Sequence, residues 1–239
     1  MSVNVAGKVN NLFLTLIQQQ ESETLTLFAL HAEKEVNSDF MLPVVYNICS
    51  EWLEGLKAST EMAIRNAGEP FKYVIILWEA SKEVQEWVEE KGFIYDIYKT
   101  DPNLGFIENL RNCFNLGYSY AFQLSDWAVP INTDMAFNFN WLKNLTKYAK
   151  EDRIINCTTV EPGPTLHTRK DFGMPGKDFR LDDFLIFCNS IYKNEIISEE
   201  QAGNRVDATP NIMHRLTWEK FGPWDVKSFN PPSDVLFFD

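Results

Sequence analysis

Positive charge and cysteine are scarce in this sequence, and each scarcity excludes a class of protein. The 22 Lys and Arg residues face 34 Asp and Glu residues, which gives a formal net charge of −12. A protein that binds nucleic acid by neutralising phosphates needs the opposite balance, so we expect no nucleic-acid partner. The four cysteines are too widely spaced for a zinc knuckle or a disulfide framework. We interpret them as buried free thiols.

Long apolar runs and a leader segment are also absent. No run reaches the roughly 18 apolar residues that a membrane-spanning helix needs, and no charged-then-apolar leader opens the chain. These absences predict a cytoplasmic protein without a transmembrane segment. The 45% hydrophobic content over 239 residues can supply an ample core, and neither a linker nor a repeat divides it. We therefore expect one domain that spans residues 1–239.

Apolar patterning in the first half of the chain predicts strands that alternate with helices. In chain order, the expected elements are a strand at 24–32, a helix at 39–65, a strand at 71–81, a helix at 82–92, a strand at 93–100, a helix at 104–122 and a strand at 127–132. The run at 71–81 is continuously apolar, as in a strand that is buried on both faces. This alternation is typical of an α/β fold with a mostly parallel, doubly wound sheet.

The second half has a less regular pattern. We expect a short helix at 140–151, strands at 153–160 and 182–190, and a helix at 211–222. Residues 161–180 carry turn formers and charges without any period, which predicts a long mobile loop. The fold class is therefore α/β with an irregular second half.

The tripeptide Asn132-Thr133-Asp134 ends the apolar run at 127–132 and carries the first candidate chemistry. In open α/β sheets, ligands bind outside the carboxyl ends of the strands. Hard oxygen donors at such an end suit Mg²⁺ or Mn²⁺, held partly by protein and partly by a ligand's phosphates. Two simpler interpretations stay open. Asp134 could cap a helix that begins near Asn140, or Asn132 could satisfy a turn.

Residues 101–134 resemble the core of family-2-like glycosyltransferases with the GT-A fold. Members of that family carry an Asn-x-Gly, a helix with a second Asn-x-Gly, a small residue, and a strand that ends in Asp-x-Asp or a variant. The corresponding positions here are Asn103, Gly105, Asn115, Gly117, Ala121 and Asn132-Thr133-Asp134. Asn132 stands where many members have an acid, so Asp134 is the only carboxylate of the metal motif.

The resemblance extends upstream of this core. Glu79 corresponds to an acid that ends a strand and binds the nucleoside. Leu30 and His31 correspond to the end of the first strand, which contacts the base. By the resemblance, these three residues join Asn103, Gly105, Asn132 and Thr133 in binding the nucleotide sugar.

Downstream, residues 221–239 resemble the family's segment for the acceptor and the base. Trp224 and Asp225 match its apolar residue and its Asp, so both are expected in acceptor binding, with Trp224 as a stacking platform. Asp234 matches the second acid of a following pair, which is the catalytic base in inverting members. A serine replaces the first acid. The chain stops at Asp239, inside the helix expected after the base, as a domain cut from a longer protein would.

The activity that the resemblance implies is that of an inverting, metal-assisted glycosyltransferase of the hexosyltransferase class. It would move a sugar from a nucleoside-diphosphate sugar to a hydroxyl of a glycan or other acceptor. A Mn²⁺ or Mg²⁺ ion, bound by Asp134 and Asn132, would neutralise the diphosphate leaving group. His214 is a candidate for a further metal ligand, although a lone histidine on a helix is more often structural.

Two other functions fit the same kind of fold. A sugar nucleotidyltransferase is also α/β and metal-dependent, but it would show a glycine-rich, basic loop after the first strand, and residues 31–40 contain no glycine. A non-catalytic carbohydrate-binding or scaffold module is favoured by Asn132 in place of an acid. The retention of Asp134 and Asp234 disfavours that module.

Overall fold

The computed structural model describes residues 42–158, 160–161, 168–193, 195, 209–221 and 223. All of them belong to one compact unit, Met41–Asp239. The single domain expected over 1–239 therefore stays a prediction, and the strand expected at 24–32 lies outside the described residues. Among the described residues, none of the helices combines the length and apolar character needed to cross a bilayer.

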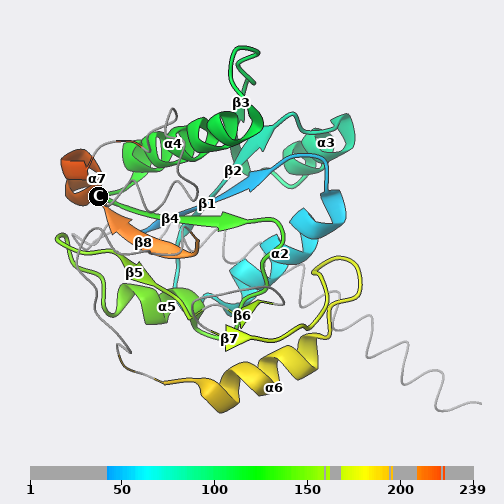
Figure 1. Ribbon diagram of the computed structural model, residues 1–239, viewed down its shortest axis with the longest axis vertical. Coiled ribbons are helices and arrows are strands. Elements are labelled where there is room, and N and C mark those ends of the chain that lie inside the picture. Colours follow the sequence, from blue (N-terminus) through cyan, green and yellow to red (C-terminus); the bar gives the residue numbers. More distant parts are fainter. Residues whose placement is uncertain are drawn as a thin grey trace, which may run out of the picture. The chain divides into compact units, whose positions relative to one another are not determined.

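The main sheet has six strands in the order β3-β2-β1-β4-β8-β5, with helices between them in the chain (Figure 1). Strands β1 to β4 are parallel, β8 is antiparallel to β4, and β5 is antiparallel to β8. A separate parallel pair joins β6 and β7. The elements are β1 (Val44–Cys49), α2 (Leu53–Asn66), β2 (Lys72–Trp78), α3 (Lys82–Glu90), β3 (Ile94–Tyr98), α4 (Phe106–Leu124), β4 (Trp127–Asn132), α5 (Trp141–Thr146), β5 (Ile155–Asn156), β6 (Val160–Glu161), β7 (Thr168–Arg169), α6 (Leu181–Ile191), β8 (Asn211–His214) and α7 (Arg215–Phe221). The expected α/β class with a mostly parallel sheet is confirmed.

Strand β1 corrects the helix expected over 39–65. The structure places a strand at Val44–Cys49 and begins the helix α2 only at Leu53. Val45 and Cys49 are four residues apart, and this spacing puts two side chains on one face of a strand as well as of a helix. All six residues of β1 are buried, which is the pattern of a strand covered on both faces.

Each face of the sheet is covered by its own helices. Helices α2, α3 and α5 pack on one face, in a core that includes Val45, Cys49, Leu56, Val84, Val88, Ile131, Trp141 and Leu142. Helix α4 packs on the other face, in a core that includes Val44, Tyr46, Val74, Cys113, Phe114, Tyr118 and Met213. The change of face between α3 and α4 accompanies the return of the chain from β3 to β4, on the far side of β1. This is the arrangement of a doubly wound sheet.

Two elements of the second half differ from the pattern-based expectation. Residues 182–190 belong to the helix α6, where carboxylates in the first turn favour the helix. Ile186 on this helix is 69% exposed, so the apolar run does not mark a buried strand. The helix expected at 211–222 begins only at Arg215, because the four buried residues before it form β8 between β4 and β5.

Helix α4 approaches β1 closely because Gly117 has no side chain. A Cβ atom at this position would lie 2.2 Å from Cε2 of Tyr46. Tyr46 is fully buried, packs edge-on against Tyr118 with 5.3 Å between ring centroids, and donates a hydrogen bond to the carbonyl oxygen of Phe114. The ring of Tyr46 therefore occupies the space that a side chain on α4 would need.

We predict that Gly117→Ala lowers the free energy of unfolding by about 1–3 kcal/mol, as overpacking of a dense core does. The gain in helix propensity, about 1 kcal/mol, works in the opposite direction. Denaturant unfolding measures the difference. In a Tyr46→Leu background the same substitution should cost clearly less, because the clashing ring is gone. A net stabilisation by Gly117→Ala alone would show that α4 and β1 are not this close.

Candidate functional site

A carboxylate follows each of the four parallel strands within three residues. Glu51 follows β1, Glu79 follows β2, Asp101 follows β3 and Asp134 follows β4. The four strands pair in register, so that Ile48 at the end of β1 lies opposite Asn132 at the end of β4. Their carboxyl ends therefore meet at one edge of the sheet, and this edge carries the four acids.

The strand order identifies the part of this edge that suits a ligand. From β1 the chain proceeds outward to β2 and β3, and then returns to place β4 on the other side of β1. The topological switch point is therefore between β1 and β4, where crevices for ligands form in open α/β sheets. Asn132-Thr133-Asp134 follows one of these two strands, and Ser50 with Glu51 follows the other.

Asn132 is held by three parts of the fold. Its side-chain amide donates to Thr209 Oγ1 at 3.3 Å, and its carbonyl oxygen accepts from Ser59 Oγ at 3.0 Å. The same carbonyl accepts from the backbone N–H of Met135 at 3.3 Å and closes a turn. Asn132 therefore takes part in a turn, which is one of its alternative roles, and it is also hydrogen-bonded to the buried Ser59 of α2.

Asp134 is exposed at the end of this turn. Helix α5 begins at Trp141 with Asn140 as its N-cap residue, so Asp134 lies too far upstream to cap it. Among the described residues, the Asp134 carboxylate has no hydrogen-bond or ion-pair partner. The helix-capping interpretation is therefore wrong, and the carboxylate is available to a ligand.

Glu79 has an unusual backbone conformation directly after β2. Its φ of 51° places a non-glycine residue in the left-handed region, where strain is common at functional sites. Its carboxylate accepts a short hydrogen bond from Thr100 Oγ1, and Thr100 in turn accepts from Trp78 Nε1 at 2.9 Å. The family resemblance pointed to Glu79 but gave no sign of Thr100, which fixes the direction of the carboxylate.

The loop of residues 101–105 follows β3 and contains Asn103 and Gly105. Its organising residue is Asn109, which is buried on α4. The Asn109 amide oxygen accepts from Tyr98 Oη and from the backbone N–H of Asp101, each at 2.8 Å. Its nitrogen donates to the carbonyls of Asp101, Leu104 and Gly105. Asn103 only closes the local turn on Asp101.

His214 does not lie near Asp134. It pairs with Trp127, at the opposite end of β4 from Asn132, and five residue steps along a strand span about 17 Å. Its ring packs edge-on against Trp127 with 4.6 Å between centroids, and Nδ1 accepts from the backbone N–H of Leu216. As a correction to the sequence-based expectation, His214 has a structural role here and is left out of the metal site.

Several expected site residues lie outside the described part of the chain. They are Leu30, His31, Trp224, Asp225 and the expected base Asp234. Their roles stay predictions. In the described sheet, the strand next to both β2 and β4 is β1, so Ser50 and Glu51 are at the strand end where Leu30 and His31 were expected.

The oxygen donors at the switch point suit a metal ion that is bound partly by a ligand. Within the described ranges, no group of three or more His, Cys, Asp or Glu side chains could hold a metal ion. Asp134 and Asn132 provide hard oxygens, which Mg²⁺ and Mn²⁺ prefer. One carboxylate and one amide are too few for a site made of protein alone. These residues fit an ion that a diphosphate ligand brings or completes.

The free cysteines offer no nucleophile to this site. Cys49 and Cys113 are buried, as expected, whereas Cys157 and Cys188 are partly exposed. Burial raises the pKa of Cys49, Cys113 and Cys157 to about 12. The thiols therefore stay protonated at neutral pH and are poor nucleophiles.

Comparisons with known proteins found matches among solved structures. No protein-family model and no curated protein matches the chain. Among solved structures, the chain is similar to glucosyl-3-phosphoglycerate synthase from Mycobacterium tuberculosis, crystallised with Mn²⁺, UDP and phosphoglyceric acid, at 9% identity and a TM-score of 0.39. The match covers 74% of this chain and 57% of that one. Because identity and TM-score are low, none of the proposals below is drawn from this neighbour.

We predict that Asn109→Ala destabilises the protein by about 2–4 kcal/mol, because it leaves buried partners of several hydrogen bonds unsatisfied. Hydrogen exchange of residues 101–105 should accelerate beyond the change in global stability. Asn103→Ala is the control, since this exposed side chain bonds only to Asp101, and we expect a change within about 0.5 kcal/mol. Equal effects of the two substitutions would contradict the organising role of Asn109.

Proposed function

We propose that this chain is a glycosyltransferase that takes its sugar from a nucleoside-diphosphate donor with the help of a divalent cation. The observation that carries the proposal is the exposed carboxylate of Asp134, which has no partner in the described part of the chain and lies beside the switch point between β1 and β4. The order of motifs along the chain, with Glu79 before Asn103-x-Gly105 and Asn132-x-Asp134 after them, supports the same activity.

Electrostatics supports a cation in this proposal. The carboxyl edge carries Glu51, Glu79, Asp101 and Asp134, and a diphosphate would be repelled by these acids without a counter-charge. When bound, a Mg²⁺ or Mn²⁺ ion supplies that charge and stabilises the leaving diphosphate. Asp134 and the side-chain oxygen of Asn132 are the proposed protein ligands.

The remaining roles follow from where each residue lies. Glu79, at the end of β2, is proposed to accept hydrogen bonds from the base or the ribose, with Thr100 holding its carboxylate in place. An inverting transfer needs a base to take the proton of the acceptor hydroxyl as it attacks. Asp234 is proposed for that role on the family resemblance alone. The class of hexosyl group is likewise a proposal from the resemblance.

We predict that Asp134→Ala abolishes the cation-dependent part of nucleoside-diphosphate binding, a loss of at least roughly tenfold in affinity for a charge-assisted contact. Calorimetric titration with UDP, GDP and ADP, each with and without Mn²⁺ or Mg²⁺, measures this loss. The free energy of unfolding should stay within about 0.5 kcal/mol, since the side chain is exposed and contacts no partner in the described ranges.

The control for this test is Glu219→Ala, which removes an exposed carboxylate from α7, the helix that follows β8. It should leave nucleotide affinity unchanged. If Asp134→Ala binds nucleotide and cation like the parent chain, the proposed metal role is wrong. If the parent binds no nucleotide under any condition, the carbohydrate-binding or scaffold module becomes the better interpretation.

A separate prediction concerns Glu79. Glu79→Ala should raise the KM for the donor by about tenfold while kcat changes little, which is the pattern of lost ground-state binding. Thr100→Val should shift KM in the same direction by a smaller factor, because it removes the hydroxyl that orients the carboxylate. A defect in kcat alone would contradict the assignment of Glu79 to the nucleoside.

A further inference from the structure

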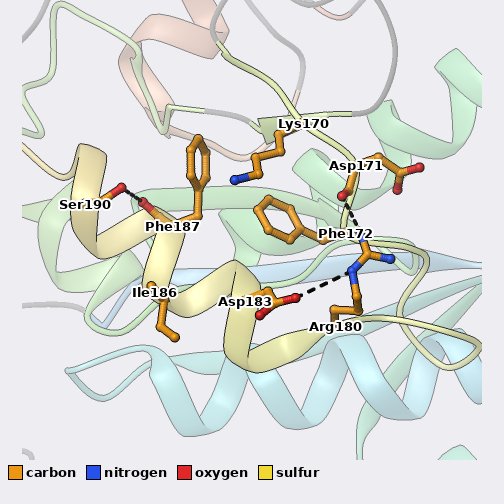
Figure 2. Close-up of a pocket in the computed structure, with 8 residues that line it drawn as sticks. All are labelled: Lys170, Asp171, Phe172, Arg180, Asp183, Ile186, Phe187 and Ser190. Carbon is orange, nitrogen blue, oxygen red and sulfur yellow. Dashed lines mark hydrogen bonds and ion pairs between the residues drawn. The ribbon is translucent and has the colours of Figure 1, made fainter.

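A pocket of about 320 Å³ lies between residues 170–180 and the helix α6, and Figure 2 shows the side chains around it. Helix α6 contributes Asp183, Ile186, Phe187 and Ser190, which share one face through their i, i+3, i+4, i+7 spacing. The segment before α6 contributes Lys170, Phe172 and Arg180. None of the four acids at the carboxyl edge lines this cavity, which we call the α6 pocket.

Lys170, an exposed residue that lines the α6 pocket, places its ammonium group over two aromatic rings. Its Nζ atom lies 4.0 Å from the ring centroid of Phe187 and 5.2 Å from that of Phe172. A cation–π contact fixes the position of an ammonium but brings no counter-charge. Among the described residues, Lys170 has no carboxylate or other hydrogen-bond partner. The positive charge of Lys170 is therefore positioned and unpaired.

The other charged groups of the pocket have partners already. Arg180 donates from Nη2 to the carbonyl oxygen of Asp171 at 2.6 Å, and its Nε lies 3.7 Å from Asp183 Oδ2 (Figure 2). Asp171 Oδ1 accepts from the backbone N–H of Gly173 at 2.7 Å. Both acids thus have a hydrogen-bond or ion-pair partner, and Lys170 is the cation of this pocket without a carboxylate partner among the described residues.

The segment before α6 is attached next to the switch point. A Cβ atom on Gly176, whose φ is +76°, would lie 2.5 Å from the carbonyl carbon and oxygen of Glu54. Glu54 is in the first turn of α2, directly after β1. From the other side, Asn138 donates to Asn189 of α6 at 3.5 Å. The α6 pocket therefore belongs to the same end of the sheet as Asp134.

We propose that the α6 pocket binds a small organic anion through a carboxylate or phosphate group on the Lys170 ammonium. The apolar part of the molecule would lie against Ile186, which lines the same pocket and is exposed. This deepens the proposed function and rests on it in one respect: the anion is then the acceptor, or part of it, held beside the donor. A neutral sugar fits less well, because the ammonium covers the ring face on which a sugar would stack.

The test is calorimetric titration of the full chain with two anions and their neutral counterparts. The pairs are glycerol 3-phosphate with glycerol, and lactate with lactamide, so that phosphate and carboxylate are tested separately. We expect at least one anion to bind and its neutral counterpart not to bind. Lys170→Met, which keeps the aliphatic stem, should weaken binding by about tenfold or more, as loss of a charged hydrogen bond does.

Two further variants control for charge and for folding. Lys170→Arg should stay within about threefold of the parent, because the charge is retained. Lys177→Met removes a lysine from the same segment outside the pocket and should leave anion binding unchanged. Thermal unfolding of each variant identifies any that fails to fold.

The outcomes separate this proposal from the proposed function. Equal binding of anions and neutral counterparts, no anion binding by the parent, or unchanged anion binding by folded Lys170→Met would each overturn the anion site. Cation-dependent nucleotide binding is measured on the same samples and should be the same in Lys170→Met as in the parent. Anion binding that depends on Lys170 without any nucleotide binding would keep the anion site and remove its role as an acceptor subsite.

Discussion

Burial of β1 on both faces and both edges is the constraint on which the rest of the described structure depends. The strand is paired with β2 on one side and β4 on the other, and all six of its residues are buried. Because β1 is filled on both edges by parallel neighbours, the chain has to change direction around it, and the change creates the switch point. The close approach of α4 at Gly117 follows from the burial of β1 as well, since α4 has to cover the second face of this strand.

Neutral side chains make many of the hydrogen bonds that hold the carboxyl edge together. Ser59 and Thr209 fix Asn132, and Asn109 fixes the loop after β3. Beneath α2, the Tyr73 hydroxyl accepts from Asn47, and burial raises its pKa to about 12. This phenol therefore stays neutral throughout the ordinary range of pH. Asn, Ser and Thr side chains stabilise the edge, so substitution of an exposed acid there need not disturb the fold.

The sequence was sufficient to predict the α/β class, the elements from β2 to β4, and the end of a strand at Asn132. It misassigned β1, because a spacing of four residues fits both a strand and a helix. It misassigned α6, because a short apolar run does not distinguish a strand from a helix. In the site, patterns indicated Glu79 and Asp134, which are separate points along the chain. They could not indicate Thr100 or Asn109, because the roles of these residues depend on contacts across the fold.

The two proposed subsites have opposite electrostatic requirements: the carboxyl edge needs a cation before an anion can bind, and the α6 pocket needs none. At the carboxyl edge, acids such as Glu79 and Asp134 repel an anionic donor until a divalent cation arrives. In the α6 pocket, Lys170 attracts an anion without any cation. Screening by salt weakens contacts between exposed charges over a Debye length of about 8 Å at physiological ionic strength. Binding at the α6 pocket should therefore weaken with added salt, whereas binding at Asp134 depends first on the cation.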